Sequence, residues 1–255
     1  MKKIIVSSLL VMFVITSLSL VGCTPSTAGT LTLEEHALQS VPQPDPFVIT
    51  LKDGTWEELQ QVHASDRAMV FPDTSTTVDG NIALTVTLNG KPLVSGQTFT
   101  NNYAESYVWV TQSGKEIYRI ATGPASPVNN LRGLWVYDGH WALETALVDL
   151  AGGDTTPFAL GQVTIDGVLQ NKARSYDEAF GLQTIAGKIF YFFKKDGKIG
   201  YFYNGQETML KYDEIQHYNC CSASTLNPIQ AQDMLAFYAR TGEAWYYVEL
   251  GIFSK

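Results

Sequence analysis

Alternating apolar and polar residues predict a series of antiparallel β-hairpins along this chain. The segment 81–96, NIALTVTLNGKPLVSG, alternates on both sides of Asn89 and Gly90, a dipeptide that two-residue hairpin turns favour. Four later segments repeat the order of strand, polar turn with a glycine, and strand, and their turns lie near Gly114, Gly139, Gly197 and Gly242. Because an isolated hairpin is marginally stable in water, we expect these hairpins to pack against one another.

Several of the predicted strands carry consecutive aromatic residues, such as FYFF at 190–193 and WYY at 245–247. Since neighbouring residues on a strand point to opposite faces, such strands need cover on both sides. We therefore expect a mainly β fold in which antiparallel aromatic hairpins form a propeller-like or two-layer arrangement. One or two short helices complete this expectation.

Three short segments carry helix signals. Residues 32–39 (TLEEHALQ) and 55–64 (TWEELQQVHA) both begin with a threonine and have a glutamate three positions later, which is the spacing of a capping box. For the second segment, a hairpin turning at Asp53 and Gly54 is the alternative. In the third segment, 227–239 (NPIQAQDMLAFYA), an asparagine cap followed by proline predicts a helix start.

The first 22 residues have the pattern of a bacterial export signal. Two lysines precede an apolar run over residues 4–21, and the run ends in LVGC at Cys23. This ending resembles the lipobox of bacterial lipoproteins, and the resemblance implies cleavage before Cys23 and lipidation of that cysteine. An uncleaved transmembrane anchor is the alternative, since the run is nearly long enough to span a bilayer.

Export and lipidation set the expected layout of the mature chain. The lipid on Cys23 would attach the protein to the cell membrane or the outer membrane, with the rest of the chain outside the cytoplasm. Residues 23–46 contain four of the ten prolines and few large apolar residues, which predicts a flexible, Pro-rich tether after the lipidated cysteine. We expect residues 47–255 to form a single, mainly β domain.

Charge and composition narrow the function classes. Without residues 1–22, the chain keeps 15 of its 17 basic residues against 25 acidic ones, so a nucleic-acid partner is not expected. No nucleophile elbow, HExxH helix, phosphate-binding glycine loop or CxxC pair occurs in the sequence. No metal-ligand spacing occurs among the four histidines, His36, His63, His140 and His217, and we expect neither a metal nor a cofactor.

Two adjacent cysteines, Cys220 and Cys221, remain once Cys23 is assigned to lipid. Their α-carbons are about 3.8 Å apart across a trans peptide, which is shorter than disulfides usually span, so a vicinal disulfide would be strained. The alternatives are two buried or free thiols, or a metal site that includes His217. Because the sequence offers no second pair of ligands, the metal site is the least favoured of the three.

A Tyr-Asp-Glu triplet occurs at 176–178 and again 36 residues later at 212–214. A glycine, a strand, a turn glycine and a further strand precede each copy, so a supersecondary repeat is predicted. We expect Tyr176 and Tyr212 to pack at equivalent seams between hairpins, while Asp213 and Glu214 accept backbone hydrogen bonds in a turn.

The segment around residues 161–218 resembles the WG-repeat proteins, also called KWG-repeat proteins. Ile199 stands where the family has its tryptophan. The matching positions are Asp196, Gly197, Lys198, Gly200, Tyr201, Gly205, Tyr212, Asp213 and Glu214. The resemblance implies a scaffold that mediates contacts, with no catalytic residues to carry over.

Aromatic residues are the main candidates for ligand recognition, because solvent-facing rings stack on sugars or on peptide side chains. Packing between sheets is the alternative role for the same rings. The wider set consists of Tyr107, Trp109, Trp135, Tyr137, Trp141, Tyr201, Tyr203, Trp245, Tyr246 and Tyr247. Within it, the predicted binding aromatics are Trp109, Trp135, Trp141, Tyr203 and Trp245.

These features predict a membrane-anchored exported lipoprotein that acts as a noncatalytic binding module. Its hairpin loops and exposed aromatics would contact an unknown protein or glycan partner. One alternative is an envelope enzyme that acts on glycans with a carboxylate pair, for instance Asp138 with Glu144, since such pairs need proximity only in space. The other is a structural component of an envelope complex.

Overall fold

The computed structural model describes residues 30–42, 49–62, 75–78, 81–124, 129–149, 158–218, 229–231 and 233–253. These residues form eighteen strands and two short helices, so the expectation of a mainly β fold is confirmed. The compact unit runs from Leu31 to Lys255 and thus begins before the boundary expected near residue 47. Within the described ranges, neither helix has the length or the apolar character needed to cross a bilayer.

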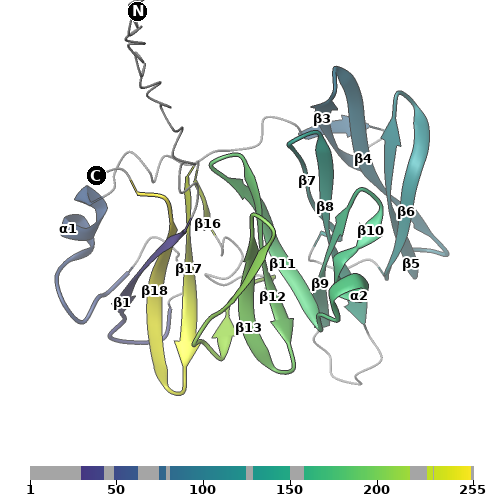
Figure 1. Cartoon of the computed structure of the whole chain (residues 1–255). Coiled ribbons are helices and arrows are strands. Elements are labelled where there is room, and N and C mark those ends of the chain that lie inside the picture. Colours follow the sequence, from purple (N-terminus) through teal and green to yellow (C-terminus); the bar gives the residue numbers. More distant parts are fainter. Residues whose placement is uncertain are drawn as a thin grey trace, which may run out of the picture. The chain divides into compact units, whose positions relative to one another are not determined.

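The strands form four antiparallel sheets that follow one another along the chain (Figure 1). The first sheet contains β2 (Ser75–Val78), β3 (Asn81–Leu88), β4 (Lys91–Thr100), β5 (Glu105–Gln112) and β6 (Lys115–Gly123). The second contains β7 (Leu131–Tyr137), β8 (His140–Asp149), β9 (Phe158–Ile165) and β10 (Val168–Leu169). The third contains β11 (Glu178–Ile185), β12 (Lys188–Lys195), β13 (Lys198–Tyr203) and β14 (Gln206–Met209).

The fourth sheet joins an early strand to the last hairpin. Its order is β1 (Thr32–Ala37), β18 (Ala244–Gly251), β17 (Met234–Thr241) and β15 (Glu214–Ile215), and β16 (Ile229–Gln230) also pairs with β17. In the other three sheets, neighbouring strands are consecutive in the sequence. The fourth sheet therefore differs from the others, because two of its paired strands, β1 and β18, are more than 200 residues apart in the sequence.

All five predicted hairpins are present: β3–β4, β5–β6, β7–β8, β12–β13 and β17–β18. In the first of them, Asn89 and Gly90 have φ angles of 50° and 73°. Two successive residues with positive φ make the turn whose twist matches that of the flanking strands. The Asn-Gly signal in the sequence thus has the geometry that it predicts.

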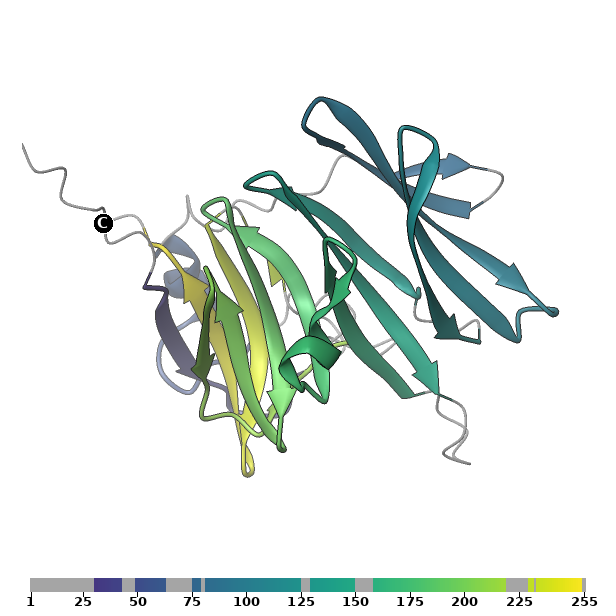
Figure 2. The same cartoon turned by 45° about the vertical axis from the view of Figure 1, so that its right-hand side comes forward.

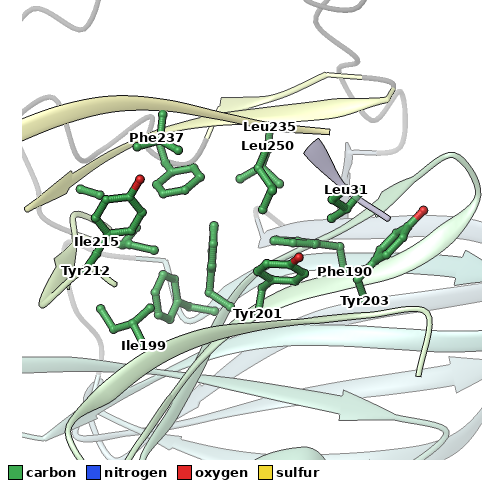
Figure 3. Packing of buried hydrophobic residues seen from close by; sticks show 14 of the residues in the cluster. Leu31, Phe190, Ile199, Tyr201, Tyr203, Tyr212, Ile215, Leu235, Phe237 and Leu250 are labelled. Atoms are coloured by element: carbon green, nitrogen blue, oxygen red, sulfur yellow. The ribbon is translucent and has the colours of Figure 1, made fainter. Parts of the chain in front are cut away.

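Strand β12 carries the four consecutive aromatic residues 190–193 and is covered on both faces. Phe190, Tyr191, Phe192 and Phe193 are each fully buried, because both faces of the strand are covered. Phe190 and Phe192 belong to the cluster shared with the fourth sheet, in which Figure 3 labels Phe190 and Phe237. The Phe192 and Phe237 rings lie 4.9 Å apart, edge to face. Tyr191 and Phe193 belong to a different cluster, shared with the second sheet. The prediction that some strands are covered on both sides is therefore confirmed.

The sheets lie side by side in chain order (Figures 1 and 2), and hydrophobic clusters link neighbouring sheets. One cluster lies between the first and second sheets, a second between the second and third, and a third between the third and fourth. The sheets thus pack as successive layers. The propeller-like alternative is not confirmed.

Helix α1 (Trp56–Gln61) forms as its sequence predicts. Thr55 and Glu58 make both hydrogen bonds of a capping box, and Leu59 packs on the outer face of the fourth sheet. The other two predicted helices are wrong. Residues 32–37 form β1 and residues 234–241 form β17, because pairing with β18 satisfies their backbone groups and outweighs local helix signals. Strand β1 also occupies part of the segment expected to be a tether, residues 23–46.

Candidate binding site

A pocket of about 380 Å³ lies beside four hairpin turns of the second and third sheets. Helix α2 (Gln170–Arg174), which follows β10, forms one wall. The lining residues are Tyr137, Asp138, His140, Ile165, Gln170, Arg174, Lys188, Ile189, Phe202, Asn204 and Gly205. The pocket therefore combines turn residues with apolar positions at the strand ends.

Two tight turns place polar groups at the rim. In the β7–β8 turn, Asp138 and Gly139 have φ angles of 45° and 81°, and in the β13–β14 turn Asn204 and Gly205 have 46° and 85°. Asp-Gly and Asn-Gly are favoured in such turns because both positions need positive φ. The short turns keep Asp138 and Asn204 close to the sheet ends and so beside the pocket.

Ion pairs tie the rim together across hairpins. Lys188 Nζ lies 2.7 Å from Asp138 Oδ2, which joins the third sheet to the second. His140 Nδ1 lies 2.5 Å from Asp166 Oδ2, and Asp166 Oδ1 accepts a hydrogen bond from the Trp141 backbone N–H. All these side chains are partly exposed, so each pair stabilises the fold by about 1 kcal/mol or less. Their main effect is to orient charges of both signs toward the opening.

The floor of the pocket is apolar and rigid. The Arg174 guanidinium lies 4.5 Å from the centre of the Phe202 ring, which is a cation–π contact, and it donates to Gln170 and Glu207. Phe202 in turn stacks on Tyr191 with ring centres 4.8 Å apart. A side chain with these contacts on several sides has little freedom, so Arg174 is held in position before any ligand arrives.

Tyr137 supplies a ring and a proton donor to the same pocket. Burial raises the pKa of its phenol to about 12, with further increases from the carboxylates of Asp166 and Asp138. The phenol therefore keeps its proton at neutral pH. The ring is half-buried and lies 5.6 Å from that of His140, so one edge of the pocket is aromatic.

The five predicted binding aromatics lie on all four sheets and do not meet in one site. Trp141 and Tyr203 are buried in the core, where the Tyr203 hydroxyl donates to the Ile185 carbonyl oxygen. Trp245 is half-buried, and the Arg240 guanidinium lies 5.8 Å from its ring centre. Trp141 and Tyr203 belong to clusters that join neighbouring sheets, whereas Trp245 packs in the cluster on the outer face of the fourth sheet.

Trp109 and Trp135 are half-buried, and each covers a glycine. A Cβ atom on Gly96 would lie 2.4 Å from the Trp109 ring, and one on Gly133 would lie 1.8 Å from the Trp135 ring. Only glycine therefore fits beneath these rings. Their role as binding residues stays a prediction, while their packing on glycine is part of the fold.

Asp138 and Glu144, the carboxylate pair considered for catalysis, have different surroundings. Asp138 is exposed in a turn, whereas Glu144 lies four residues beyond His140 on β8, about 13 Å farther along the strand. Glu144 is buried and accepts hydrogen bonds from the backbone N–H groups of Gly181 and Leu182, at 3.0 and 2.7 Å. The two carboxylates therefore do not share a cleft.

A β-bulge explains how Glu144 is held. The pairing of β11 with β12 shifts register between Phe180 and Gln183, so the N–H groups of Gly181 and Leu182 point away from β12. Both donate to the Glu144 carboxylate, which also accepts from the Tyr218 hydroxyl. One side chain thereby joins the second sheet, the third sheet and the segment that follows β15 of the fourth sheet.

His217 and Glu178 form a second buried link that the sequence did not reveal. His217 Nε2 lies 2.9 Å from Glu178 Oε1, and Nδ1 lies 2.7 Å from the Ile215 carbonyl oxygen. Both ring nitrogens thus face an acceptor, the Glu178 carboxylate and the Ile215 carbonyl oxygen. A metal site that combines His217 with Cys220 and Cys221 would need a free ring nitrogen, and both nitrogens of His217 are engaged here.

Burial of Glu178 acts to raise the pKa of its carboxyl, but the net shift is downward. Hydrogen bonds from His217 and from the Gly161 backbone N–H favour the charged form, as do the charges of His217 and Lys194. Gly161 is on β9, so the ion pair also fastens the second sheet to the third. The link is therefore structural.

The two repeated tyrosines have equivalent partners. Tyr176 is buried, stacks on Phe193 with ring centres 4.4 Å apart, and donates to Glu207 at 2.7 Å. Tyr212 is buried in the next layer and donates to Glu35 at 2.8 Å. Their prediction as seam residues is confirmed.

The acidic residues of the triplets are only partly as expected. Asp213 accepts a hydrogen bond from the Gly242 backbone N–H, which confirms its predicted role. Glu214 instead binds the Arg240 guanidinium, so that prediction is wrong. Glu178 begins β11, the first strand of the third sheet, and Glu214 begins β15, an end strand of the fourth sheet. The repeat in the sequence thus marks equivalent entries into the third and fourth sheets.

Sequence reasoning found only parts of the pocket. Tyr137 belongs to the wider aromatic set, and His140 is the residue after the predicted turn at Gly139. Arg174, Lys188 and Phe202 carry no local signal, because they meet the others through the packing of two sheets. The predicted sites at Cys23, Cys220 and Cys221 lie outside the described residues. No protein-family model matches the chain, and no curated protein matches it.

Proposed function

We propose that this protein is an exported lipoprotein, anchored to the membrane through Cys23, that acts as a noncatalytic binding module. The pattern of residues 1–23 supports export and anchoring. The pocket between the second and third sheets supports the binding role and is the proposed ligand site. The single observation that carries the proposal is the meeting of four hairpin turns around an aromatic, charged depression.

A segment of glycan is the ligand that this pocket suits best. Sugar hydroxyls donate and accept hydrogen bonds, and the lining offers an acceptor on Asp138 and donors on Lys188, Arg174 and Tyr137. Lys188 and Arg174 are each paired with a carboxylate, that of Asp138 and that of Glu207, and this balance of charge favours a neutral, polar ligand over a strongly charged one. The half-buried Tyr137 ring offers an apolar face of the kind on which a sugar ring stacks.

The surroundings of the carboxylates favour binding over hydrolysis. A glycosidase needs one carboxyl group to donate a proton and another to act as nucleophile or base. Asp138 is paired with Lys188, and Asp166 with His140 and a backbone N–H. Glu144 and Glu178 are buried and bound by backbone donors. These groups hold the protein together and orient the rim.

Calorimetric titration of the mature protein with envelope-derived oligosaccharides tests the proposal. We expect Tyr137→Ala to weaken binding about tenfold, since an aromatic contact contributes about 1–1.5 kcal/mol. The matched control is Tyr103→Ala, which removes an exposed tyrosine from the β4–β5 turn, outside the pocket lining. Equal affinities of the two variants would contradict the pocket as the ligand site. Binding of peptides in place of glycans would contradict the proposal that the ligand is a glycan.

A further inference from the structure

Three potential metal ligands meet on the outer face of the fourth sheet. Glu34 and His36 are two residues apart on β1 and so share a face, and Glu249 on β18 lies directly opposite Glu34 in the register. One ligand atom from each residue lies within 4.8 Å of those of the other two. The pairing of β1 with β18 therefore creates a donor set of one imidazole nitrogen and two carboxylate oxygens.

The surroundings of His36 indicate that this set is built for a ligand. Its Nε2 atom is fully buried and has no hydrogen-bond partner in the described part of the chain. A buried polar atom without a partner is costly, and a bound ion is one of the ordinary explanations for it. The unpartnered Nε2 atom of His36 thus points to a ligand independently of the two glutamates.

Glu249 has the properties of a ligand supported by its neighbours. Its side chain is fully buried, next to the apolar cluster under α1. The Tyr247 hydroxyl donates to Glu249 Oε1 at 3.0 Å, which fixes the orientation of the carboxylate. Metal-binding carboxylates commonly have such a supporting hydrogen bond.

We propose that Glu34, His36 and Glu249 bind a divalent transition-metal ion, with zinc as the representative. Imidazole with carboxylate is a donor set that zinc accepts, whereas magnesium and calcium prefer oxygen ligands alone. Bonds of about 2.0–2.2 Å would draw the three ligand atoms to about 3.4 Å from one another, which side-chain rotation can achieve. The ion would clip the edge strand β1 onto β18, and a water or other small ligand would complete its coordination.

The sequence expectation of no metal rested on spacing along the chain. Glu34 and His36 were read as part of a helix, in which residues two apart do not share a face. On a strand they do, and Glu249 joins them only through the pairing of distant segments. The proposal is independent of the pocket and its ligand.

Thermal unfolding of the metal-stripped mature protein, with zinc added back, tests the site. At zinc concentrations about 100 times the dissociation constant, we expect the midpoint to rise by about 5–10 °C, while magnesium and calcium leave it unchanged. His36→Ala and Glu34→Gln should each abolish most of the zinc-induced rise. Glu35→Gln is the matched control, because Glu35 is the next residue on β1 but faces the opposite side and binds Lys211 and Tyr212.

Cobalt replacement gives a readout that does not depend on any variant. We expect the wild-type protein to bind one cobalt ion with a visible spectrum typical of nitrogen and oxygen ligands. A thiolate-to-cobalt band would place the ion at Cys220 and Cys221 and overturn the proposal. A zinc-induced rise that persists in His36→Ala, or no zinc binding by the wild type, would also overturn it.

Discussion

The imidazole of His217 lies flat on the ring of Phe180, with ring centres 3.6 Å apart and planes inclined by 5°. Phe180 is on the third sheet, and His217 belongs to the segment that leads from β15 toward β16. The stacking positions His217 for its bond to Glu178, which in turn binds the second sheet through Gly161. An imidazole, an aromatic face and a buried carboxylate therefore hold three sheets together at one point.

Replacement of Glu178 by glutamine should lower the free energy of unfolding at neutral pH by about 3 kcal/mol, because it removes the charged partner from a buried side-chain pair with His217. Denaturant unfolding at pH 7 measures this change. Glu243→Gln, an exposed glutamate in the β17–β18 turn, is the control and should alter stability by less than about 0.5 kcal/mol.

The same glutamate should make the stability depend on pH in the acid range. The pKa of Glu178 is lowered in the folded protein below its usual value of 4.5, so its stabilisation is fully present above that value. It is lost as the pH falls through the lower, folded-state pKa. Unfolding curves between pH 7 and pH 2 should show a steeper loss for the wild type than for Glu178→Gln, and parallel curves would contradict this assignment.

Truncation of Phe192 should cost about 3–5 kcal/mol of stability, the usual range for a fully buried phenylalanine. Phe192 lies between the third and fourth sheets and contacts Phe190 and Phe237 edge to face. Chemical denaturation of Phe192→Ala measures the loss. Ile117→Ala, which shortens an exposed side chain on β6, serves as the comparison and should change stability by less than about 0.5 kcal/mol. Similar losses in both variants would contradict the layered core.

Replacement of Cys23 by serine should release the protein from the membrane fraction, because the acyl chains that would anchor it have no other attachment site. Membrane fractionation and mass spectrometry of the mature protein check this expectation. Cys220→Ser should stay in the membrane fraction and keep the lipid mass. A wild-type protein that retains residues 1–22 would instead support the uncleaved anchor.

Local signals predicted the hairpins but not the long-range pairings. A tight turn requires residues that accept positive φ, and the sequence supplies them at Asn89-Gly90. A strand covered on both faces requires consecutive apolar residues, and the sequence supplies them at 190–193. Residues 32–37 carry a capping-box spacing, and only contact with β18 makes them a strand. The pocket depends in the same way on stacking, since Lys188 meets Asp138 from 50 positions away.

The pairing of β1 with β18 sets an order of events for a chain that crosses a membrane with its N-terminal end first. Residues 32–37 would emerge early, and their partner at 244–251 would emerge more than 200 residues later. Until then β1 has an exposed edge and a long loop to close, which is an entropic cost that hairpins between neighbouring strands avoid. Pairing of β1 in the fourth sheet would therefore wait until the β17–β18 hairpin has crossed the membrane.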